Sequence, residues 1–279
     1  MTESTIGSRT APRTESGETP EAGSRLAWLV SDTLVMARRS MLHYVRVPTV
    51  LFFALVQPII FLLLFRYVFG NAIGAGIGVD YADYIVPGII LQTALFAATN
   101  TAVGLAADMG TGVIDRFRTL PMSRSALLTG RTLADLSRNV VVILLMIVVG
   151  YLIGFDFQNG PWAAIGAVLL ALLFGWSFSW VGAAIGLSIR NSEAAQSANM
   201  LWMFPLMFTS SLFVPTRTLP SWLRAVADVN PITFGVDAVR ALSLGGANTA
   251  GKVTGALIWC LVLVVVFIPL SVHLYRRPE

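Results

Sequence analysis

Residues 108–135 read DMGTGVIDRFRTLPMSRSALLTGRTLAD and form the longest polar interruption in the middle of an otherwise apolar chain. The interruption is cationic and carries Arg116, Arg118, Arg124 and Arg131. Its first half has apolar residues at helical spacing, which places them on one helix face: Val113, Ile114, Phe117 and Leu120. Pro121 ends this pattern because proline cannot continue a helix. The stretch predicts either a short amphipathic helix that acts as a rigid lever toward a cytoplasmic partner, or a solvated basic loop that only sets topology.

The composition around this stretch is that of a membrane protein. The chain has 279 residues, of which 56% are hydrophobic and 12% are charged, and its mean hydropathy is +0.74. Soluble domains carry about 25% charged residues, roughly twice this share. The net charge of +4 does not indicate nucleic-acid binding, because the arginines alternate with apolar segments instead of sharing one soluble face. The single Cys260 excludes an intramolecular disulfide and a cysteine metal cluster.

Several apolar segments are long enough to cross a bilayer, which needs about 20 residues in a helix. We expect six transmembrane helices, at about 48–69, 84–107, 137–155, 161–188, 198–214 and 254–274. The predicted fold class is therefore an all-α integral membrane protein whose transmembrane domain covers residues 48–279. The fourth span contains small residues, which let helix backbones approach closely: Gly166, Gly175, Gly182, Ala183 and Gly186.

The N-terminal part divides into two segments. Residues 1–24 are rich in Ser, Thr, Glu, Gly and Pro, so we expect a disordered cytoplasmic tail that cannot bury enough apolar surface to fold. Residues 25–47 have one apolar face, which predicts an amphipathic helix in the membrane interface. Its arginines Arg38, Arg39 and Arg46 would lie near anionic lipid headgroups. The alternative is a cytosolic extension of the first span.

Residues 215–253 are neither a tail nor a span. Leu219, Trp222, Leu223 and Val226 fit one short amphipathic helix, and Phe234, Val236, Val239, Ala241 and Leu242 fit a second. Asn230-Pro231 breaks the pattern between them. We expect a helical hairpin between spans 5 and 6 that dips into the outer leaflet. With the N-terminus inside, the inner side receives 14 of the 19 Arg and Lys residues, so both termini are predicted to be cytoplasmic.

Chemistry inside the predicted membrane region is sparse. The apolar cores of the six spans contain no Asp, Glu, Lys, Arg or His, whereas proton-coupled transporters usually place such groups at mid-membrane. No acid–base cluster or metal-ligand set is visible, so no catalytic residue and no metal site are expected. The run from Gly246 to Lys252 matches the first seven positions of a P-loop, but Val253 replaces the Ser or Thr that binds magnesium. We therefore expect any driving energy to come from a partner protein.

Two stretches resemble one family of transporters. The loop DRFRTLPMSRSALLTGRTLAD (115–135) resembles a stretch of ABC-2 type permeases that reads E-R-hydrophobic-R-T-x-P-x-S-R … L-x-x-G-R/K. Asp115 stands where many relatives carry Glu. The segment PLMFTSSLFVPTRTLPSWLRAVADVNPITFGVDAVRAL (205–242) resembles the exit of their fifth span and their N-P-x-T/S-x-x-x-D-A-x-R-x-L signature. With the leading amphipathic helix and the six-span order, the resemblance covers about residues 25–277. It points to the daunorubicin-resistance type of actinobacterial exporters.

The resemblance implies the partners and the cargo. It implies a permease that pairs with a second permease copy, identical or paralogous, and binds two copies of a separate ABC ATPase. ATP and magnesium would then be bound by that partner, and this chain would bind no cofactor. The chain itself would lie in the cytoplasmic membrane, in contact with lipids. The cargo implied is an amphipathic drug, antibiotic or lipid-like molecule. An ABC-2 exporter of a cell-surface polysaccharide or glycolipid is the alternative, and an intramembrane lipid-modifying enzyme is a more distant one.

The resemblance also assigns residues. It makes the short helix a coupling helix that contacts the ATPase through Val113, Ile114, Asp115, Arg116, Phe117 and Arg118. It makes the hairpin a closure of the outer side, with structural residues Trp222, Asn230, Pro231, Asp237 and Arg240. Asp237 and Arg240 stand three apart on a helix and are expected to pair. A path between spans 1, 2 and 5 would be lined by residues such as Gln57, Gln92, Asn100, Phe208 and Ser211.

Overall fold

The computed structural model describes residues 48–70, 80–111 and 124–276. Three predicted features lie outside these residues, namely the N-terminal tail, the interface helix 25–47 with Arg38, Arg39 and Arg46, and the coupling residues 113–118. They remain predictions from the sequence.

The described chain is built from helices. In chain order these are α2 (Pro48–Leu64), the π-helical turn η1 (Phe65–Phe69), α4 (Tyr81–Gly110), α6 (Arg124–Leu152), α7 (Pro161–Ser188), α8 (Ser192–Phe208), the 3-10 turn η2 (Thr216–Thr218), α9 (Ser221–Val229), α10 (Pro231–Leu244) and α11 (Thr249–Arg276). No strand occurs in the parts of the chain that the structure describes. The predicted all-helical class is therefore confirmed.

Four of these helices are long and apolar enough to cross a membrane. They are α4, α6 over Asp135–Leu152, α7, and α11 over Thr249–Tyr275. The first predicted span is represented by a shorter apolar helix over Val56–Phe69. The fifth is represented by α8, which has 17 residues. The protein is thus a helical multi-pass membrane protein with four clear candidate spans.

Two helices differ in position from the predicted spans. α6 begins at Arg124 instead of 137, so the last arginines of the basic stretch belong to the same helix as the third span. α8 covers 192–208 instead of 198–214. It begins early because the Asn191 side chain accepts hydrogen bonds from the Glu193 and Ala194 backbone N–H groups, at 2.8 and 3.0 Å, and so caps the helix.

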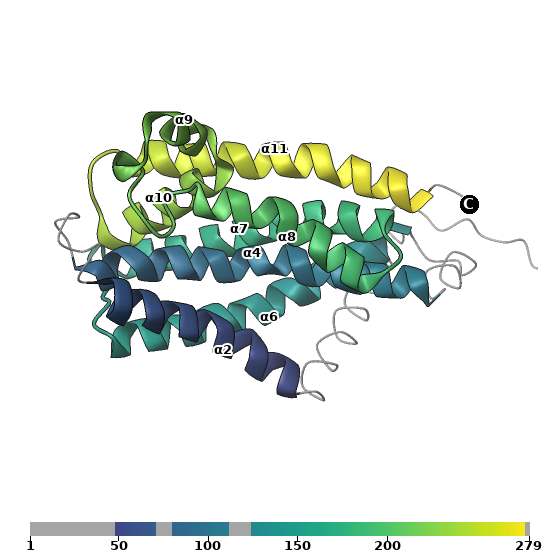
Figure 1. The fold of residues 1–279 in the computed structure, drawn as a ribbon, viewed down its shortest axis with the longest axis horizontal. Coiled ribbons are helices and arrows are strands. Elements are labelled where there is room, and N and C mark those ends of the chain that lie inside the picture. The colour runs from purple at the N-terminus through teal and green to yellow at the C-terminus, as the bar shows by residue number, and fades with distance from the viewer. Residues whose placement is uncertain (1–47, 71–79, 112–123, 277–279) are drawn as a thin grey trace, which may run out of the picture.

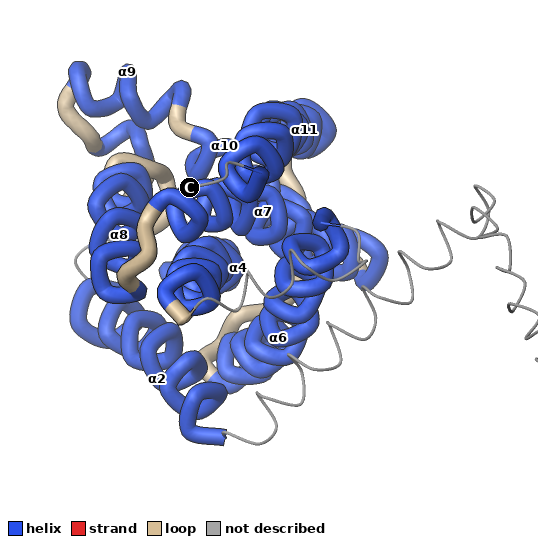
Figure 2. The backbone as a smooth tube through the Cα atoms, turned by 90° about the vertical axis from the view of Figure 1, so that its right-hand side faces the viewer, coloured by secondary structure: helices blue, strands red, loops and turns tan. Residues whose placement is uncertain are grey.

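The bundle is arranged around α4, which runs through its middle (Figure 1) and is surrounded by the other long helices when seen end-on (Figure 2). α7 packs most closely against it, through glycines. A Cβ atom added at Gly175, Gly182 or Gly186 would lie 2.6, 2.0 or 2.4 Å from a carbonyl oxygen of α4, contributed by Ala94, Ala98 and Ala102 respectively. The close approach predicted from these glycines is confirmed, because no side chain fits between the two backbones there.

The helices at the edge of the bundle turn apolar side chains outward. Only 17% of the apolar stretch of α11 is buried within the chain. Its exposed large apolar residues are Leu257, Ile258, Leu261, Val262, Val265, Val266 and Leu270. Such a face is stable in lipid, which suits the outer position of α11 in Figure 1.

The segment between α8 and α11 forms the two short helices expected from the sequence. The helical pattern breaks at Asn230-Pro231, as predicted, with α9 ending at Val229 and α10 beginning at Pro231. Both helices lie at the end of the bundle where α4 begins and α8 ends (Figure 1). This arrangement brings α10 against the start of α4 and the chain that leaves α8.

Candidate functional site: a polar pocket and the cluster at the end of the bundle

A pocket of about 150 Å³ lies between α2, α4, α6 and α8. Its lining residues are Gln57, Pro58, Thr93, Phe96, Thr99, Asn100, Arg138, Asn139, Val142, Gln196 and Met200. The rim is formed by exposed amides of Gln57 and Gln196, and the floor by buried side chains of α4 and α6. A concave site with a few polar groups in an apolar surrounding is the usual form of a small-molecule site.

The polar floor of this pocket is held by hydrogen bonds. Asn199 on α8 donates to the Thr99 hydroxyl at 2.6 Å and so joins α8 to α4. Asn139 on α6 donates to the Ala94 carbonyl at 3.3 Å. One helical turn before Asn139, the buried carboxylate of Asp135 accepts a hydrogen bond from Thr101 at 2.6 Å. These bonds hold α4, α6 and α8 together around the floor, because a buried polar group that loses its hydrogen-bond partner destabilises the fold.

The rim adds hydrogen-bonding capacity to the pocket. Neither Gln57 nor Gln196 makes a side-chain hydrogen bond to any residue that the structure describes. Each amide offers two donors and an acceptor. Among the described lining residues Arg138 is the only charged one, and it is buried. The pocket therefore suits a ligand with hydrogen-bonding groups attached to an apolar body.

The structure brings together some of the predicted path residues and separates others. Gln57 and Asn100 both line the pocket. Gln92 is buried elsewhere in the bundle. Phe208 is exposed, with its ring 5.2 Å from that of Phe213. Ser211 is buried and belongs to a different cluster, described below, because it lies in the turn after α8 and not in a span.

Several lining residues were not anticipated from the sequence. Arg138 and Asn139 were placed at the start of the third span, and the structure shows them inside the bundle because α6 continues toward the N-terminus. Gln196 was assigned to a loop, although it lies on α8 one turn before Met200. On α4 the spacing of Thr93, Phe96 and Asn100 does place them on one helix face, and this signal was available.

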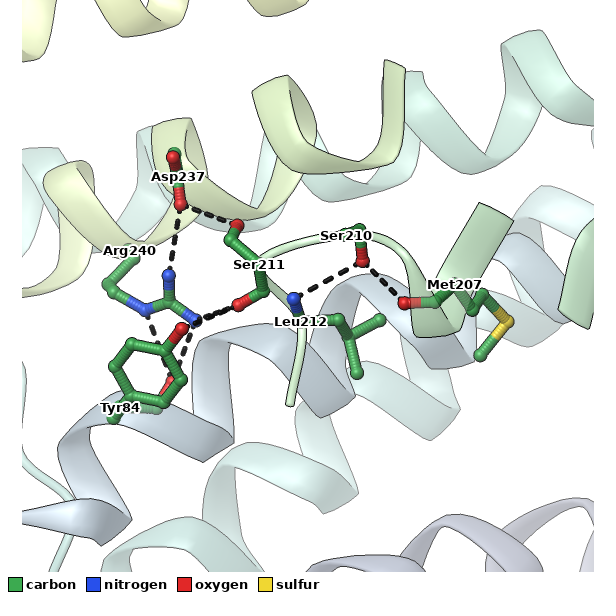
Figure 3. A network of polar contacts seen from close by, with 7 residues as sticks. All are labelled: Tyr84, Met207, Ser210, Ser211, Leu212, Asp237 and Arg240. Carbon is green, nitrogen blue, oxygen red and sulfur yellow. Dashed lines mark hydrogen bonds and ion pairs between the residues drawn. The ribbon is translucent and has the colours of Figure 1, made fainter. Parts of the chain in front are cut away.

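At the end of the bundle, α4, α10 and the turn after α8 are joined by a polar cluster (Figure 3). Arg240 on α10 donates to the Tyr84 carbonyl from Nε at 3.2 Å and from Nη2 at 3.1 Å, and also to the Ser211 carbonyl at 3.1 Å. The Tyr84 hydroxyl donates to the same Ser211 carbonyl at 2.7 Å. The guanidinium therefore joins three segments that are distant in sequence.

Asp237 completes this cluster. Its Oδ1 lies 3.0 Å from Nη1 of Arg240, so the predicted pair is present. The same oxygen accepts a hydrogen bond from the Ser211 hydroxyl at 2.6 Å. Figure 3 shows Ser211 beside Asp237 and Arg240, with its hydroxyl joined to the carboxylate and its carbonyl joined to the guanidinium. The pairing was predictable because it is local in the helix, whereas the contacts with Tyr84 and Ser211 depend on packing.

Asn230 fixes the break between α9 and α10. Its Oδ1 accepts from the Ile232 backbone N–H at 2.9 Å and caps α10. Its Nδ2 donates to the Leu206 carbonyl at 2.7 Å and to the Thr209 hydroxyl at 3.2 Å. Pro231 occupies the first turn of α10, where a missing N–H has no cost. Trp222, the fifth predicted hairpin residue, is exposed on α9.

No group of three or more potential metal ligands occurs in the described residues. The P-loop-like run at Gly246–Lys252 leads into α11 and follows α10. A P-loop instead connects a strand to a helix.

The chain is similar to known permeases over most of its length. The profile of the ABC-2 type transporter family matches residues 31–244. The daunorubicin resistance ABC transporter permease protein DrrB1 of Streptomyces coeruleorubidus is 36% identical, over 96% of this chain and 98% of its own. The probable doxorubicin resistance ABC transporter permease protein DrrC of Mycobacterium tuberculosis is 26% identical, over 89% of each chain. A putative transport permease, ycf38 of Porphyra purpurea, is 22% identical over 76% of this chain and 74% of its own.

The family match covers more than half of the residues, and one similar protein aligns with almost the whole chain. The resemblance noted in the two sequence stretches is therefore confirmed, and the chain belongs to the ABC-2 type transporter family.

Proposed function

We propose that this chain is the membrane-spanning permease subunit of an ATP-driven exporter for an amphipathic drug, antibiotic or lipid-like molecule. The observation that carries the proposal is the pocket between α2, α4, α6 and α8, whose polar floor and amide rim interrupt an otherwise apolar bundle. Similar proteins are named for resistance to daunorubicin and doxorubicin, which are compounds of the cargo class that such a pocket fits. A volume of about 150 Å³ suits part of a small amphiphile better than a polymer channel.

The proposal includes six spans in the cytoplasmic membrane, with both termini in the cytoplasm. α2 with η1 extends from Pro48 to Phe69, and α8 contributes 17 residues. Both pack against α4, one of the four clear candidate spans. The end of the bundle with α9 and α10 would then face outward and form the predicted outer-leaflet hairpin. The excess of arginine at the opposite side supports this orientation.

Two copies of an ABC ATPase would supply the energy, with ATP and magnesium bound there and not in this chain. Residues 113–118 would contact that subunit, and a second permease copy, identical or paralogous, would complete the path. Closure of the ATPases on ATP would move the two permease copies and expose the pocket to the other side of the membrane.

The test is reconstitution of the complex. The chain is co-expressed with its ABC ATPase subunit, purified into lipid nanodiscs, and assayed for ATP hydrolysis with a panel that includes daunorubicin, other amphiphiles, a glycolipid and a polysaccharide. We expect a stable complex whose hydrolysis rate responds to amphiphiles. A hydrolysis-deficient ATPase serves as the control in a vesicle efflux assay. A response confined to the polysaccharide or glycolipid would favour the alternative cargo, and absence of any ATPase association would overturn the proposal.

A further inference from the structure

A second pocket, of about 260 Å³, lies where α9 and α10 meet the beginning of α11. Its lining residues are Thr216, Asp228, Thr233, Phe234, Asp237, Asn248, Gly251 and Lys252. It shares none of its lining with the pocket between α2, α4, α6 and α8. Its chemistry also differs, because it holds side chains of both charge signs.

The charged groups of this pocket retain bonding capacity. Asp228 and Lys252 form no ion pair and no side-chain hydrogen bond with any described residue. Asp237 accepts both of its hydrogen bonds at Oδ1, so Oδ2 is available to a ligand. The pocket therefore presents two carboxylates and one ammonium, and none of the three is fully used within the described protein.

Thr233 gives an independent sign that a ligand binds here. It lines the pocket and is only 7% exposed, yet its hydroxyl has no hydrogen-bond partner in the described part of the chain. Buried hydroxyls are nearly always hydrogen-bonded in folded proteins. The hydroxyl oxygen is itself buried, so a rotation of the Thr233 side chain toward the pocket would let a ligand group supply the missing partner.

The position of the pocket points to a lipid. Lys252 lies in the first turn of α11, a candidate membrane span. Beyond it the helix exposes Ile258, Leu261 and Val265, with more than half of each residue accessible. A charged residue followed by an outward apolar face marks the level where headgroups meet acyl chains. A molecule with its polar end in the pocket would lay its apolar chains along α11.

We propose that this pocket binds the headgroup of a phospholipid that carries a primary ammonium and a phosphodiester, as phosphatidylethanolamine does. Asp228 and Asp237 accept from the ammonium, and Lys252 contacts the phosphate. A primary ammonium has three N–H donors for the carboxylates and the Thr233 hydroxyl, whereas the trimethylammonium of a choline lipid has none. An anionic glycerol headgroup offers no cation to Asp228 or to the free Oδ2 of Asp237, whose Oδ1 is paired with Arg240.

The test measures which lipid the purified chain retains. The chain is exchanged into vesicles containing equal amounts of phosphatidylethanolamine, phosphatidylcholine and phosphatidylglycerol, extracted gently, and analysed by native mass spectrometry. We expect ethanolamine lipid to be enriched by about tenfold, which corresponds to roughly 1.4 kcal/mol. Asp228→Asn and Lys252→Gln should each remove most of this enrichment. Both positions are exposed, so the variants should still elute as folded protein on size exclusion.

Glu193→Gln is the matched control, because it removes one negative charge at the opposite end of the bundle, where α8 begins. It should leave the enrichment unchanged. Dodecylamine, which has an ammonium and no phosphate, separates the two halves of the site. It should displace the lipid poorly, and Lys252→Gln should not alter its binding. Equal retention of the three lipids, or retention that neither Asp228→Asn nor Lys252→Gln reduces, would overturn the proposal.

Discussion

The guanidinium carbon of Arg240 on α10 lies 3.7 Å from the centroid of the Tyr84 ring on α4, while its Nε and Nη2 groups donate to the carbonyl of the same tyrosine. The two residues are 156 positions apart in sequence. One arginine thus contacts both the side chain and the backbone of Tyr84, which combines a cation–π contact with charge-assisted hydrogen bonds. This relationship attaches α10 to the beginning of the central helix.

Loss of the Arg240 side chain should therefore weaken the fold. Arg240→Ala leaves Asp237 without its ion-pair partner and removes the three hydrogen bonds to the Tyr84 and Ser211 carbonyls. We expect a loss on the order of 2–4 kcal/mol in the free energy of unfolding. Arg240→Lys should recover only part of it, because lysine lacks the planar fork. The measurement is the apparent Tm of the detergent-purified protein by fluorescence-detected size exclusion.

Arg66→Ala is the comparison for this series. Arg66 pairs with Asp80 at 2.7 Å, but the Asp80 side chain is half exposed, so the pair is worth about 0–1 kcal/mol. An equal fall in Tm for Arg66→Ala and Arg240→Ala would show that the cluster in Figure 3 contributes no more to stability than the exposed Arg66–Asp80 pair.

Gly182→Ala should be poorly tolerated. The added Cβ would lie 2.0 Å from the Ala98 carbonyl oxygen, so α7 and α4 would have to separate. Overpacking of this kind costs about 1–3 kcal/mol or more. Gly166→Ala on the same helix meets only Leu242 at 3.8 Å and should be neutral or stabilising by up to about 1 kcal/mol, because alanine favours the helix. Membrane yield and Tm measure both, and matching behaviour of the two variants would contradict the close packing of α4 and α7.

Asn230 allows its two roles to be separated. Asn230→Ser keeps a side-chain oxygen to cap α10 but loses the amide donation to Leu206, whereas Asn230→Ala loses both. We expect Asn230→Ala to cost about 1–2 kcal/mol more than Asn230→Ser, the usual value of a helix cap. The readout is Tm together with protease sensitivity of the α9–α10 segment. Indistinguishable variants would mean that the cap contributes little.

The rim of the pocket between α2, α4, α6 and α8 should govern cargo affinity. Gln57→Leu and Gln196→Leu keep much of the volume but remove the free amides, and each should raise the KM for amphiphile-stimulated hydrolysis by about three- to tenfold, a loss of roughly one hydrogen bond. Basal hydrolysis should not change. Ser188→Ala is the control, because that hydroxyl bonds only to the Ala184 carbonyl of its own helix. An unaltered KM in both glutamine variants would show that the cargo binds at another site.

The coupling residues remain a prediction from the sequence. Phe117→Ala and Arg116→Glu should uncouple ATP hydrolysis from export by about tenfold or more while leaving expression and membrane insertion intact. The measurement is transported cargo per ATP hydrolysed in proteoliposomes. Arg224→Glu makes the same charge reversal on exposed α9 and should preserve the ratio. Normal export by both coupling variants would show that residues 113–118 are not the contact with the ATPase.

The class of the protein and its local features were predictable from the amino-acid sequence. Low charge and long apolar runs require helices in a membrane, and Asn230-Pro231 ends one short helix and begins the next. The Asp237–Arg240 pair was predictable for the same reason, since residues three apart on a helix are neighbours wherever that helix lies. The glycines of α7 predicted close packing, although they did not identify Ala94, Ala98 and Ala102 as the opposing residues.

Contacts between residues far apart in the sequence could not be predicted and are seen only in the folded protein. Gln57, Asn139 and Gln196 line one pocket because four helices place them there, and Ser211 joins Arg240 because α8 ends early and turns. The same holds for Asp228 and Lys252, which share the second pocket across α9 and α11. Helical periodicity states which side of a helix a residue occupies, but not which other helix covers that side. That choice depends on the packing of whole surfaces against one another.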